Sequence, residues 1–343
     1  MAQKAKESNV IFRPHFKTHQ SAEIGEWFRE EGVTKITVSS FTMAEYFAGA
    51  GWKDILVAFP VNILEIDRIN TLASKLDLSL LIESEESLNF LAKNLTSKVN
   101  ISIKIDTGYH RTGIAWDDFD KIQSLVELAS KSAIMDFTGF VVHSGNTYQV
   151  KSPEEIIQIH NDSLQKLSQL KANLSSEGII QLISIGDTPS CSIVDVFNGA
   201  DEIRPGNFVF YDVMQSELGS CSINDIAVAL ACPVVAVHPE RNEAVIYGGA
   251  IHLSKEFITD SKGNKVFGLP VKLTEGGWTE PLTGTYVKAL SQEHGIISST
   301  SEILSGVKPG DVIGILPIHS CLTAHQMRHY VTPHGKLIAT MNS

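Results

Sequence analysis

Short runs of apolar residues alternate with longer amphipathic stretches over the first two thirds of the chain. Apolar runs that end at polar or turn residues are typical of buried β-strands. We predict such strands at Val10–Pro14, Lys35–Ser39, Asp54–Phe59, Leu78–Glu83, Val99–Asp106, Phe137–His143, Ile179–Gly186 and Glu202–Arg204. Between them, apolar residues recur every three or four positions, which predicts amphipathic helices. We predict these helices at Ala22–Glu31, Thr42–Ala50, Ile63–Lys75, Glu85–Lys93, Phe119–Ser130, Pro153–Asn173 and Ser190–Phe197.

Eight strands joined by helices favour parallel pairing, and eight is the number that closes a (β/α)8 barrel. An open, doubly wound sheet is the alternative. After Tyr211 the pattern changes to short strands separated by Gly, Pro and Ser turns, predicted at Ala227–Val237, Glu243–Ile246, Val271–Leu273, Tyr286–Leu290 and Asp311–Leu316. The sequence therefore predicts an α/β barrel over residues 1–215, followed by a smaller all-β domain over residues 216–343.

Composition narrows the class of protein. The 343 residues include 28 basic and 39 acidic side chains, a formal net charge of −11 that opposes binding to nucleic acid. Four cysteines are too few for a disulfide framework. The polar start has no signal-peptide pattern, and the longest apolar stretch, Ile226–Val237, is shorter than the roughly 20 residues of a membrane span. We expect a cytoplasmic protein without a membrane or nucleic-acid partner.

Candidate chemistry gathers where the predicted barrel strands end, which is where barrel enzymes place their catalytic groups. Lys17 follows the first strand in the segment Arg13–His19, which reads Arg-Pro-His-Phe-Lys-Thr-His. Crowding by Arg13, His15 and His19 favours the neutral amine, which is the nucleophilic form of lysine. An ordinary surface lysine is the alternative interpretation.

Two further loops carry polar groups. Arg111 lies after the fifth strand, where it is suited to bind a carboxylate or phosphate with two hydrogen bonds. His143 ends the sixth strand, where its flat ring is suited to stack on a planar ligand, and the phenol of Tyr148 follows it. A polar turn and a buried core histidine are the alternatives.

Glycine-containing loops follow the seventh and eighth strands, at Ser184–Ser190 and Glu202–Asn207. Barrels commonly bind a phosphate at these two loops, because free backbone N–H groups point toward the ligand there. In the β part, His319 and Cys321 stand two residues apart on a segment that we predict to be extended, so that both side chains share one face. Imidazole and thiolate suit zinc.

The sequence has no glycine-rich dinucleotide loop, P-loop, His-Glu-x-x-His helix or Gly-x-Ser-x-Gly turn. The motifs that are present resemble those of fold-type III enzymes of pyridoxal phosphate. Within that group, the chain is similar to the D-serine dehydratase and D-threonine aldolase family, with an alanine racemase-like barrel. The matching segments are Arg13–His19, Lys104–Gly113, His143–Tyr148, Ser184–Ser190, Glu202–Asp212, Ser291–Gly295 and Gly310–Thr323.

The resemblance assigns roles to residues of this chain. It implies that Lys17 forms the internal aldimine with pyridoxal phosphate and acts as the base, while Arg204 or Tyr211 faces the ring nitrogen. The cofactor-binding residues that it implies are Lys17, Arg111, His143, Tyr148, Gly186, Thr188, Arg204, Gly206, Asn207 and Tyr211. It also implies that His319 and Cys321 bind Zn²⁺, because dehydratases of this family pair histidine with cysteine, whereas the aldolases pair it with aspartate.

The resemblance thus implies a zinc-assisted lyase that dehydrates a D-serine-like amino acid to a keto acid and ammonia, and a homodimer. The alternatives are a D-threonine aldolase, a racemase, or a non-catalytic protein that only binds pyridoxal phosphate. Two features depart from the family pattern. Family members begin with a further strand and helix, which we expect to be missing before Arg13, and Ile318 stands where many relatives have a polar residue.

Overall fold

The computed structural model describes residues 1–174 and 181–343. The chain forms two compact units. The first unit contains Met1–Lys17 and Ala22–Gly206, and the second contains Thr18–Ser21 and Asn207–Ser343. Thr18–Ser21 belong with the second unit because Tyr330 Oη donates to His19 O (2.7 Å) and Met341 N donates to Gln20 O (2.8 Å).

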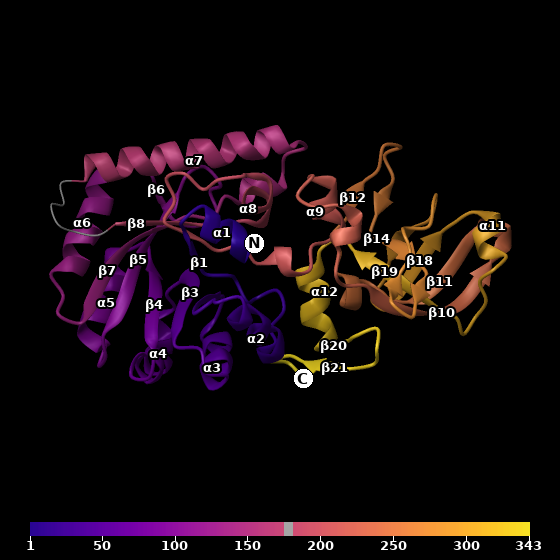
Figure 1. The fold of residues 1–343 in the computed structure, drawn as a ribbon, viewed down its shortest axis with the longest axis horizontal. Helices are drawn as coiled ribbons and strands as arrows, with labels where there is room; N and C mark the ends of the chain where they lie inside the picture. The colour runs from indigo at the N-terminus through magenta and orange to yellow at the C-terminus, as the bar shows by residue number, and fades with distance from the viewer. Residues whose placement is uncertain (175–180) are drawn as a thin grey trace. The chain divides into compact units, whose positions relative to one another are not determined.

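The first unit is built around a parallel sheet with strand order β1-β9-β8-β7-β5-β4-β3-β2, and the short strand β6 pairs with β5 (Figure 1). The strands are β1 (Ile11–Phe12), β2 (Lys35–Val38), β3 (Asp54–Pro60), β4 (Asp77–Ile82), β5 (Val99–Asp106), β6 (Ile114–Ala115), β7 (Met135–Val141), β8 (Leu182–Ile185) and β9 (Glu202–Ile203). The circle is completed beyond β1, where Phe16 N donates to Thr37 O (2.8 Å) and Thr37 N donates to Pro14 O (2.9 Å). The predicted eight-stranded barrel is confirmed.

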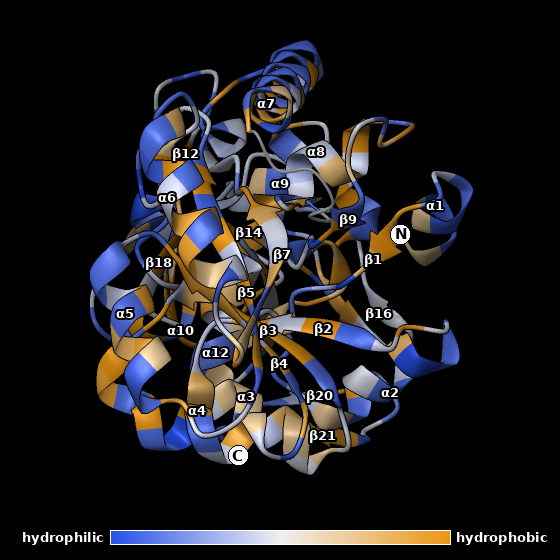
Figure 2. Cartoon of the chain, turned by 90° about the vertical axis from the view of Figure 1, so that its left-hand side faces the viewer, coloured by the Kyte–Doolittle hydropathy of each residue, from blue (hydrophilic) through white to orange (hydrophobic). Residues whose placement is uncertain are grey.

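Helices cover the outside of the barrel, and α7 runs along one side of it (Figure 1). The helices are α1 (Ala2–Glu7), α2 (Ala22–Glu30), α3 (Phe41–Gly49), α4 (Ile66–Ala73), α5 (Glu85–Asn94), α6 (Phe119–Ser130), α7 (Pro153–Asn173) and α8 (Thr188–Ile193), with 3₁₀ turns η1 (Ile63–Glu65), η2 (Gly145–Tyr148) and η3 (Asn207–Val209). Figure 2 shows hydrophilic and hydrophobic residues together on α5 and α6, as expected for helices with one buried face.

Most predicted elements of the barrel exist, with shifted ends. The seventh strand begins at Leu182, and the predicted residues 179–180 lie outside the described part of the chain. The last predicted helix begins at Thr188, earlier than expected, because Asp187 caps its N-terminus and accepts from Ser190 N. The helix ends at Ile193. The first strand is much shorter than predicted, and the residues after it complete the barrel through the isolated bridge between His15 and Thr37.

Gly139 is a point of close approach inside the sheet. Its φ angle is +143°, and a Cβ atom there would lie 2.2 Å from Leu182 O of the neighbouring strand β8. Gly139→Ala is therefore expected to lower stability by about 3 kcal/mol, because the added methyl group must push two paired backbones apart. Thermal unfolding measures this change.

Gly49 in helix α3 is the matched control for that substitution. A Cβ atom at Gly49 meets nothing within 4 Å, so Gly49→Ala is expected to leave the unfolding temperature unchanged or raise it. Equal unfolding temperatures for the Gly139 and Gly49 variants would contradict this account of Gly139.

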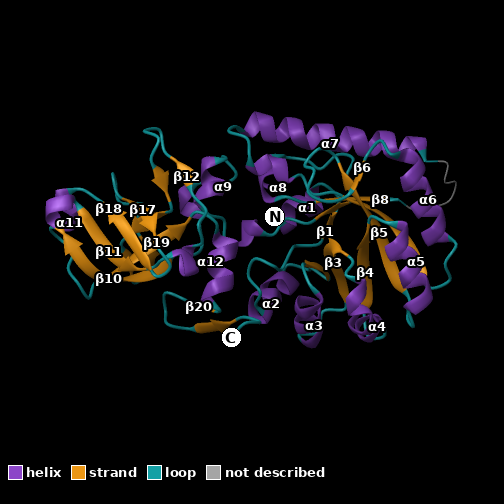
Figure 3. Cartoon of the chain, turned by 180° about the vertical axis from the view of Figure 1, so that it is seen from behind, coloured by secondary structure: helices purple, strands orange, loops and turns teal. Residues whose placement is uncertain are grey.

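The second unit consists mainly of antiparallel strands joined by loops (Figure 3). Its main sheet has six strands in the order β14-β19-β10-β11-β18-β17, namely β10 (Leu230–His238), β11 (Glu243–Tyr247), β14 (Gly268–Val271), β17 (Tyr286–Leu290), β18 (His294–Ser298) and β19 (Val312–Pro317). Three small two-stranded sheets are formed by β12 (Ile258–Thr259) with β13 (Lys265–Val266), β15 (Leu273–Thr274) with β16 (Gly277–Trp278), and β20 (His329–Val331) with β21 (Leu337–Ala339).

Short helices complete this unit, namely α9 (Val213–Glu217), η4 (Ile223–Asp225), η5 (Pro239–Arg241), α10 (Ala250–Leu253), α11 (Ser301–Leu304) and α12 (Ser320–Met327). Leu230, Ile246 and Ile297 are among the residues of its apolar core. The sequence did not predict β18, which contains Gly295 and pairs with both β11 and β17. Within the described residues, no helix is both long and apolar enough to cross a membrane.

Candidate active site

Several cationic side chains and His15 gather at the ends of the barrel strands. Lys17 is exposed, and its charge acts on both His15 and His143. Burial lowers the pKa of His15 well below its usual value, and the nearby charges of Lys17 and Arg204 lower it further. The predicted meeting of Lys17 with His15 at this end of the barrel is therefore present in the structure, and the surroundings favour an anionic ligand.

Arg13 and His19 do not provide the crowding that we predicted around Lys17. Arg13 donates to Asp54 and Glu202 at the opposite, N-terminal end of the barrel, with both distances 2.6 Å. His19 is buried in the second unit, where its Nδ1 accepts from Ser21 N (3.1 Å). Burial lowers the pKa of His19 to about 3, so its ring is neutral.

His143 is held in one tautomer. Its Nδ1 lies 2.5 Å from Gly186 O, and because a carbonyl oxygen only accepts, Nδ1 carries the proton. Burial, followed by the charge of Arg111, lowers the pKa of His143 well below its usual value, so the ring is neutral. Its ring centroid lies 5.9 Å from that of Tyr109 and 6.4 Å from that of Tyr148. The structure therefore presents a flat, uncharged ring flanked by two phenol rings.

The N-terminus of α8 has the features of an anion site. Thr188 N lies 3.3 Å from Tyr148 Oη, which brings together two residues predicted to bind cofactor. The Thr188 hydroxyl is buried and has no hydrogen-bond partner within the described part of the chain. A Cβ atom at Gly186 would lie 2.9 Å from Arg204 Cβ, so glycine allows the two neighbouring loops to approach each other. Burial raises the pKa of the capping residue Asp187 to about 6.

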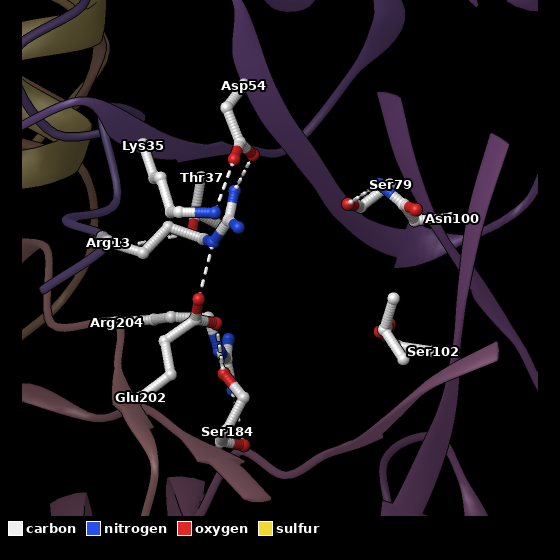
Figure 4. Close-up of polar contacts among 11 residues, drawn as sticks. Arg13, Lys35, Thr37, Asp54, Ser79, Asn100, Ser102, Ser184, Glu202 and Arg204 are labelled. Carbon is white, nitrogen blue, oxygen red and sulfur yellow. Dashed lines mark hydrogen bonds and ion pairs between the residues drawn. The ribbon is translucent and has the colours of Figure 1, made fainter. Parts of the chain in front are cut away.

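Arg204 ends a chain of polar contacts inside the barrel (Figure 4). Arg204 Nε donates to Ser184 Oγ (2.6 Å), and Ser184 Oγ donates to Glu202 Oε1 (2.6 Å). Arg204 Nη2 donates to Val142 O (2.5 Å). Burial lowers the pKa of Arg204 to about 10, against the opposing effect of Glu202, so the guanidinium stays charged at neutral pH. The side chain is thus fixed in place with its charge retained.

The chain of contacts continues toward the N-terminal end of the barrel, where a polar cavity of about 230 Å³ lies beside it. Glu202 Oε2 accepts from Arg13, and Asp54 accepts from both Arg13 and Lys35. Figure 4 shows Ser79, Asn100 and Ser102 facing this chain across the open space. Barrel interiors are usually filled by branched aliphatic side chains, so this interior is unusually polar.

Lys104 is a buried amine that the sequence reasoning did not single out. Burial, together with the charges of Arg204 and Arg111, lowers the pKa of Lys104 to about 7. Arg111, a predicted cofactor-binding residue, lies with its guanidinium carbon 5.2 Å from the centre of the Tyr109 ring. The loop containing both is held by Asp106, whose Oδ1 accepts from Gly108 N and Tyr109 N, each at 2.9 Å.

The predicted metal ligands meet in the second unit, together with other residues from the same unit. The side chains of His319 and Cys321 are in hydrogen-bond contact, and His319 Nδ1 lies 3.5 Å from Asp212 Oδ2. Thr18 Oγ1 lies 3.3 Å from Cys321 Sγ, and Asn207 Nδ2 lies 3.5 Å from the same sulfur. Burial opposes protonation of His319, but the contacts with Asp212 and Cys321 raise its pKa to about 10.

The local backbone around this pair differs from our prediction. The strand ends at Pro317, His319 is the N-cap of α12, and Cys321 lies inside the helix, so the segment is not extended. A helix start also brings the two side chains together, because the chain turns between them. Asn207 and Tyr211, predicted to bind cofactor, belong to this unit, where Tyr211 N donates to Asn207 O (2.7 Å).

The residues present fit both implied groups. The orphaned, buried hydroxyl of Thr188 fits the phosphate of pyridoxal phosphate, and the neutral ring of His143 fits a stacked pyridine. For a metal, no group of three or more His, Cys, Asp or Glu side chains is placed to hold an ion within residues 1–174 and 181–343, so His319 and Cys321 would be its two protein ligands. The remaining positions would be open to water or substrate, as in catalytic metal sites.

Two family models together cover most of the chain. The model described as "Alanine racemase, N-terminal domain" matches residues 1–213, and the model described as "Putative serine dehydratase domain" matches residues 227–332. D-serine dehydratase of Dictyostelium discoideum is 32% identical over 364 residues, covering 96% of this chain and 88% of that protein.

D-threo-3-hydroxyaspartate dehydratase of Delftia sp. (strain HT23) is 26% identical over 340 residues, covering 96% of this chain and 88% of that protein. Its solved structure superposes with a TM-score of 0.89 at 25% identity, covering 98% of this chain and 91% of that chain. These similarities extend through both units of the chain. The chain belongs to the D-serine dehydratase family of fold-type III pyridoxal phosphate lyases, whose barrel is alanine racemase-like.

Proposed function

We propose that the protein dehydrates a D-β-hydroxy amino acid, such as D-serine or D-3-hydroxyaspartate, to a keto acid and ammonia, with a zinc ion at His319 and Cys321. The contact between these two side chains carries the proposal, because it pairs an imidazole with a sulfur, two ligand types that zinc prefers. The 32% identical relative named D-serine dehydratase supports the substrate class.

The barrel residues have separate tasks in this proposal. Pyridoxal phosphate, when bound, supplies the electron sink that makes the α-proton of the substrate acidic. Lys17 holds the cofactor and accepts that proton. Gly186, Thr188, Gly206 and Asn207 hold the phosphate. His143 lies against the pyridine ring of the cofactor, with Tyr148 nearby. Arg111 stabilises negative charge near that ring.

The ring nitrogen needs a partner, and we propose Arg204 for that role ahead of Tyr211. The contacts of Arg204 with Ser184 and Val142 fix its guanidinium inside the same unit as Lys17 and His143. A guanidinium donates a hydrogen bond without giving up its proton, so it keeps the ring nitrogen unprotonated.

The metal ligands act on the other end of the substrate. A divalent metal ion, when bound, acts as a Lewis acid on the β-hydroxyl and makes it a better leaving group. His319 and Cys321 hold the ion by only two bonds, so the substrate oxygen has room to bind. We also propose that the active form is a homodimer, as expected from the family resemblance.

One assay tests the proposed reaction. The purified holoenzyme is given D-serine, D-threonine and D-3-hydroxyaspartate, each with and without a chelator, and keto acid and aldehyde are measured. We expect keto acid from D-serine or D-3-hydroxyaspartate and a large loss of rate with chelator. Glycine and acetaldehyde from D-threonine, with little keto acid from the other two, would show an aldolase instead. Chelator-insensitive racemisation would show a racemase, and no turnover at all a non-catalytic protein.

A further inference from the structure

Asp212 is a buried carboxylate at the centre of the His319–Cys321 region. Its side chain is fully buried, with 0% exposure. Its Oδ1 caps α9 by accepting from Gln215 N (2.9 Å). Its Oδ2 accepts from the backbone N of Ser320 (3.0 Å), and Ser320 is the residue between the two predicted metal ligands. The same Oδ2 lies 3.5 Å from His319 Nδ1. One carboxylate therefore ties the start of α9 to the start of α12.

Asp212 determines the orientation of the Asn207 side-chain amide. Because a carboxylate only accepts, the Asn207 atom 2.8 Å from Asp212 Oδ2 must be the amide nitrogen. The same nitrogen lies 3.0 Å from Ser320 Oγ and 3.5 Å from Cys321 Sγ, so its second hydrogen points toward this region of α12. The Asn207 amide oxygen is buried and has no hydrogen-bond partner among the residues that the structure describes.

The second unit holds further buried polar atoms close to these residues in the chain. The Gln215 side-chain amide and the Thr323 hydroxyl also have no hydrogen-bond partner within the described residues. Gln215 N donates a hydrogen bond to Asp212 Oδ1, and Thr323 N donates to His319 O (3.5 Å). Buried polar groups are nearly always satisfied, so orphaned atoms such as these indicate ordered water or a hydrated ion.

We propose that Asp212 and Asn207 are positioning residues for the metal ion, an inference that rests on the proposed metal site. Asp212 accepts the Nδ1 proton of His319, which leaves the Nε2 lone pair of the imidazole for the metal. Asn207, held by Asp212, shares its second amide hydrogen between Ser320 Oγ and the Cys321 thiolate, which Thr18 Oγ1 also contacts. The Asn207 amide oxygen accepts a hydrogen bond from a water molecule bound to the ion.

Metal binding without substrate tests the inference. The full-length protein is stripped of metal, and its zinc affinity is measured by competition with a chromogenic chelator for wild type, Asp212→Asn and Asn207→Ala. We expect a 10- to 100-fold loss of affinity for Asp212→Asn, a typical effect of removing a residue that orients a metal ligand. Asp212→Glu, which keeps the charge, is expected to recover part of that loss.

Cobalt(II) provides a readout that a general loss of stability does not move. We expect the thiolate-to-cobalt absorption band to shift to lower energy in Asn207→Ala, because a thiolate that loses a hydrogen bond is more easily oxidised. Asp225→Asn is the matched control, since Asp225 is an exposed carboxylate that caps η4 in the same unit. It is expected to match wild type in both measurements.

The outcomes separate the inference from the proposed function. If wild type binds neither zinc nor cobalt, the metal site itself is wrong, and the positioning roles fall with it. If wild type binds metal while Asp212→Asn and Asn207→Ala bind it equally tightly and give the wild-type cobalt spectrum, only the positioning roles are overturned. Should Asp212→Asn not fold, Asn207→Ala decides alone, by its affinity and its cobalt spectrum.

Discussion

Replacing Lys17 with alanine is expected to reduce turnover by at least about 10³-fold, because in the proposed mechanism Lys17 is both the covalent attachment point of the cofactor and the base at the α-carbon. The neighbours of Lys17 support this expectation. Its charge acts on His15 and His143, and Arg204 acts on the same His15, so the amine lies in the cationic group of the first unit. Another lysine of that group, Lys104, is buried.

The measurement combines activity with absorbance of the cofactor. Wild type is expected to give a band near 420 nm, a value expected of lysine-bound pyridoxal phosphate, whereas Lys17→Ala should show only the spectrum of the unattached cofactor. Lys53→Ala is the control, because Lys53 is exposed just before β3, at the opposite end of a barrel strand. Full activity in Lys17→Ala, or a wild-type protein without the band, would contradict the role of Lys17.

The sequence predicted that Arg13 crowds Lys17, but it did not predict how deep in the barrel each of the two residues lies. The strand β1 ends at Phe12, His15 forms an isolated bridge with Thr37, and Lys17 lies in the turn that follows. Arg13 reaches Asp54 and Glu202 at the N-terminal end, whereas Lys17 stands at the C-terminal end. Depth depends on where the barrel begins, which the local pattern does not encode.

The barrel itself was predictable because its strands are buried on both faces and read as apolar runs. The strand β18 was not, since Gly295 interrupts its pattern and its pairing with β11 and β17 depends on residues far away in the chain. The same limit applies to the contacts around His319 and Cys321, the proposed metal ligands. Thr18 directly follows Lys17 in a segment that we interpreted only as part of the cofactor site. Its contact with Cys321 joins residues more than 300 positions apart in the chain.

The position of Asp212 at the start of a helix could have been predicted from the sequence. It directly follows Tyr211 in a segment that matches the family, and an aspartate before Val-Met-Gln is a recognisable helix cap. Its second contact, with the backbone of Ser320, depends on the fold and has no local signal. Chemistry within one segment was therefore predictable, and chemistry shared by two distant segments was not.

Removal of the proposed metal ligands is expected to have the second large effect. His319→Ala and Cys321→Ala should each reduce dehydration by at least about 10²-fold, because the β-hydroxyl would then leave without a Lewis acid. Metal content should fall in parallel, since each variant keeps only one of the two proposed protein ligands. Chelator treatment of wild type should give the same loss, and added zinc should restore the rate.

A second cysteine of the same unit makes the test specific for Cys321. Cys221 is a free thiol that is partly exposed, and Cys221→Ala should retain metal and activity. The cofactor band should persist in both cysteine variants, because Lys17 and the residues around it belong to the first unit, whereas Cys321 belongs to the second. A Cys321→Ala protein that loses metal but still dehydrates D-serine or D-3-hydroxyaspartate at the wild-type rate would show that the ion takes no part in expelling the hydroxyl group. A parallel loss of metal and rate, with the cofactor band intact, would assign the expulsion step to the His319–Cys321 pair.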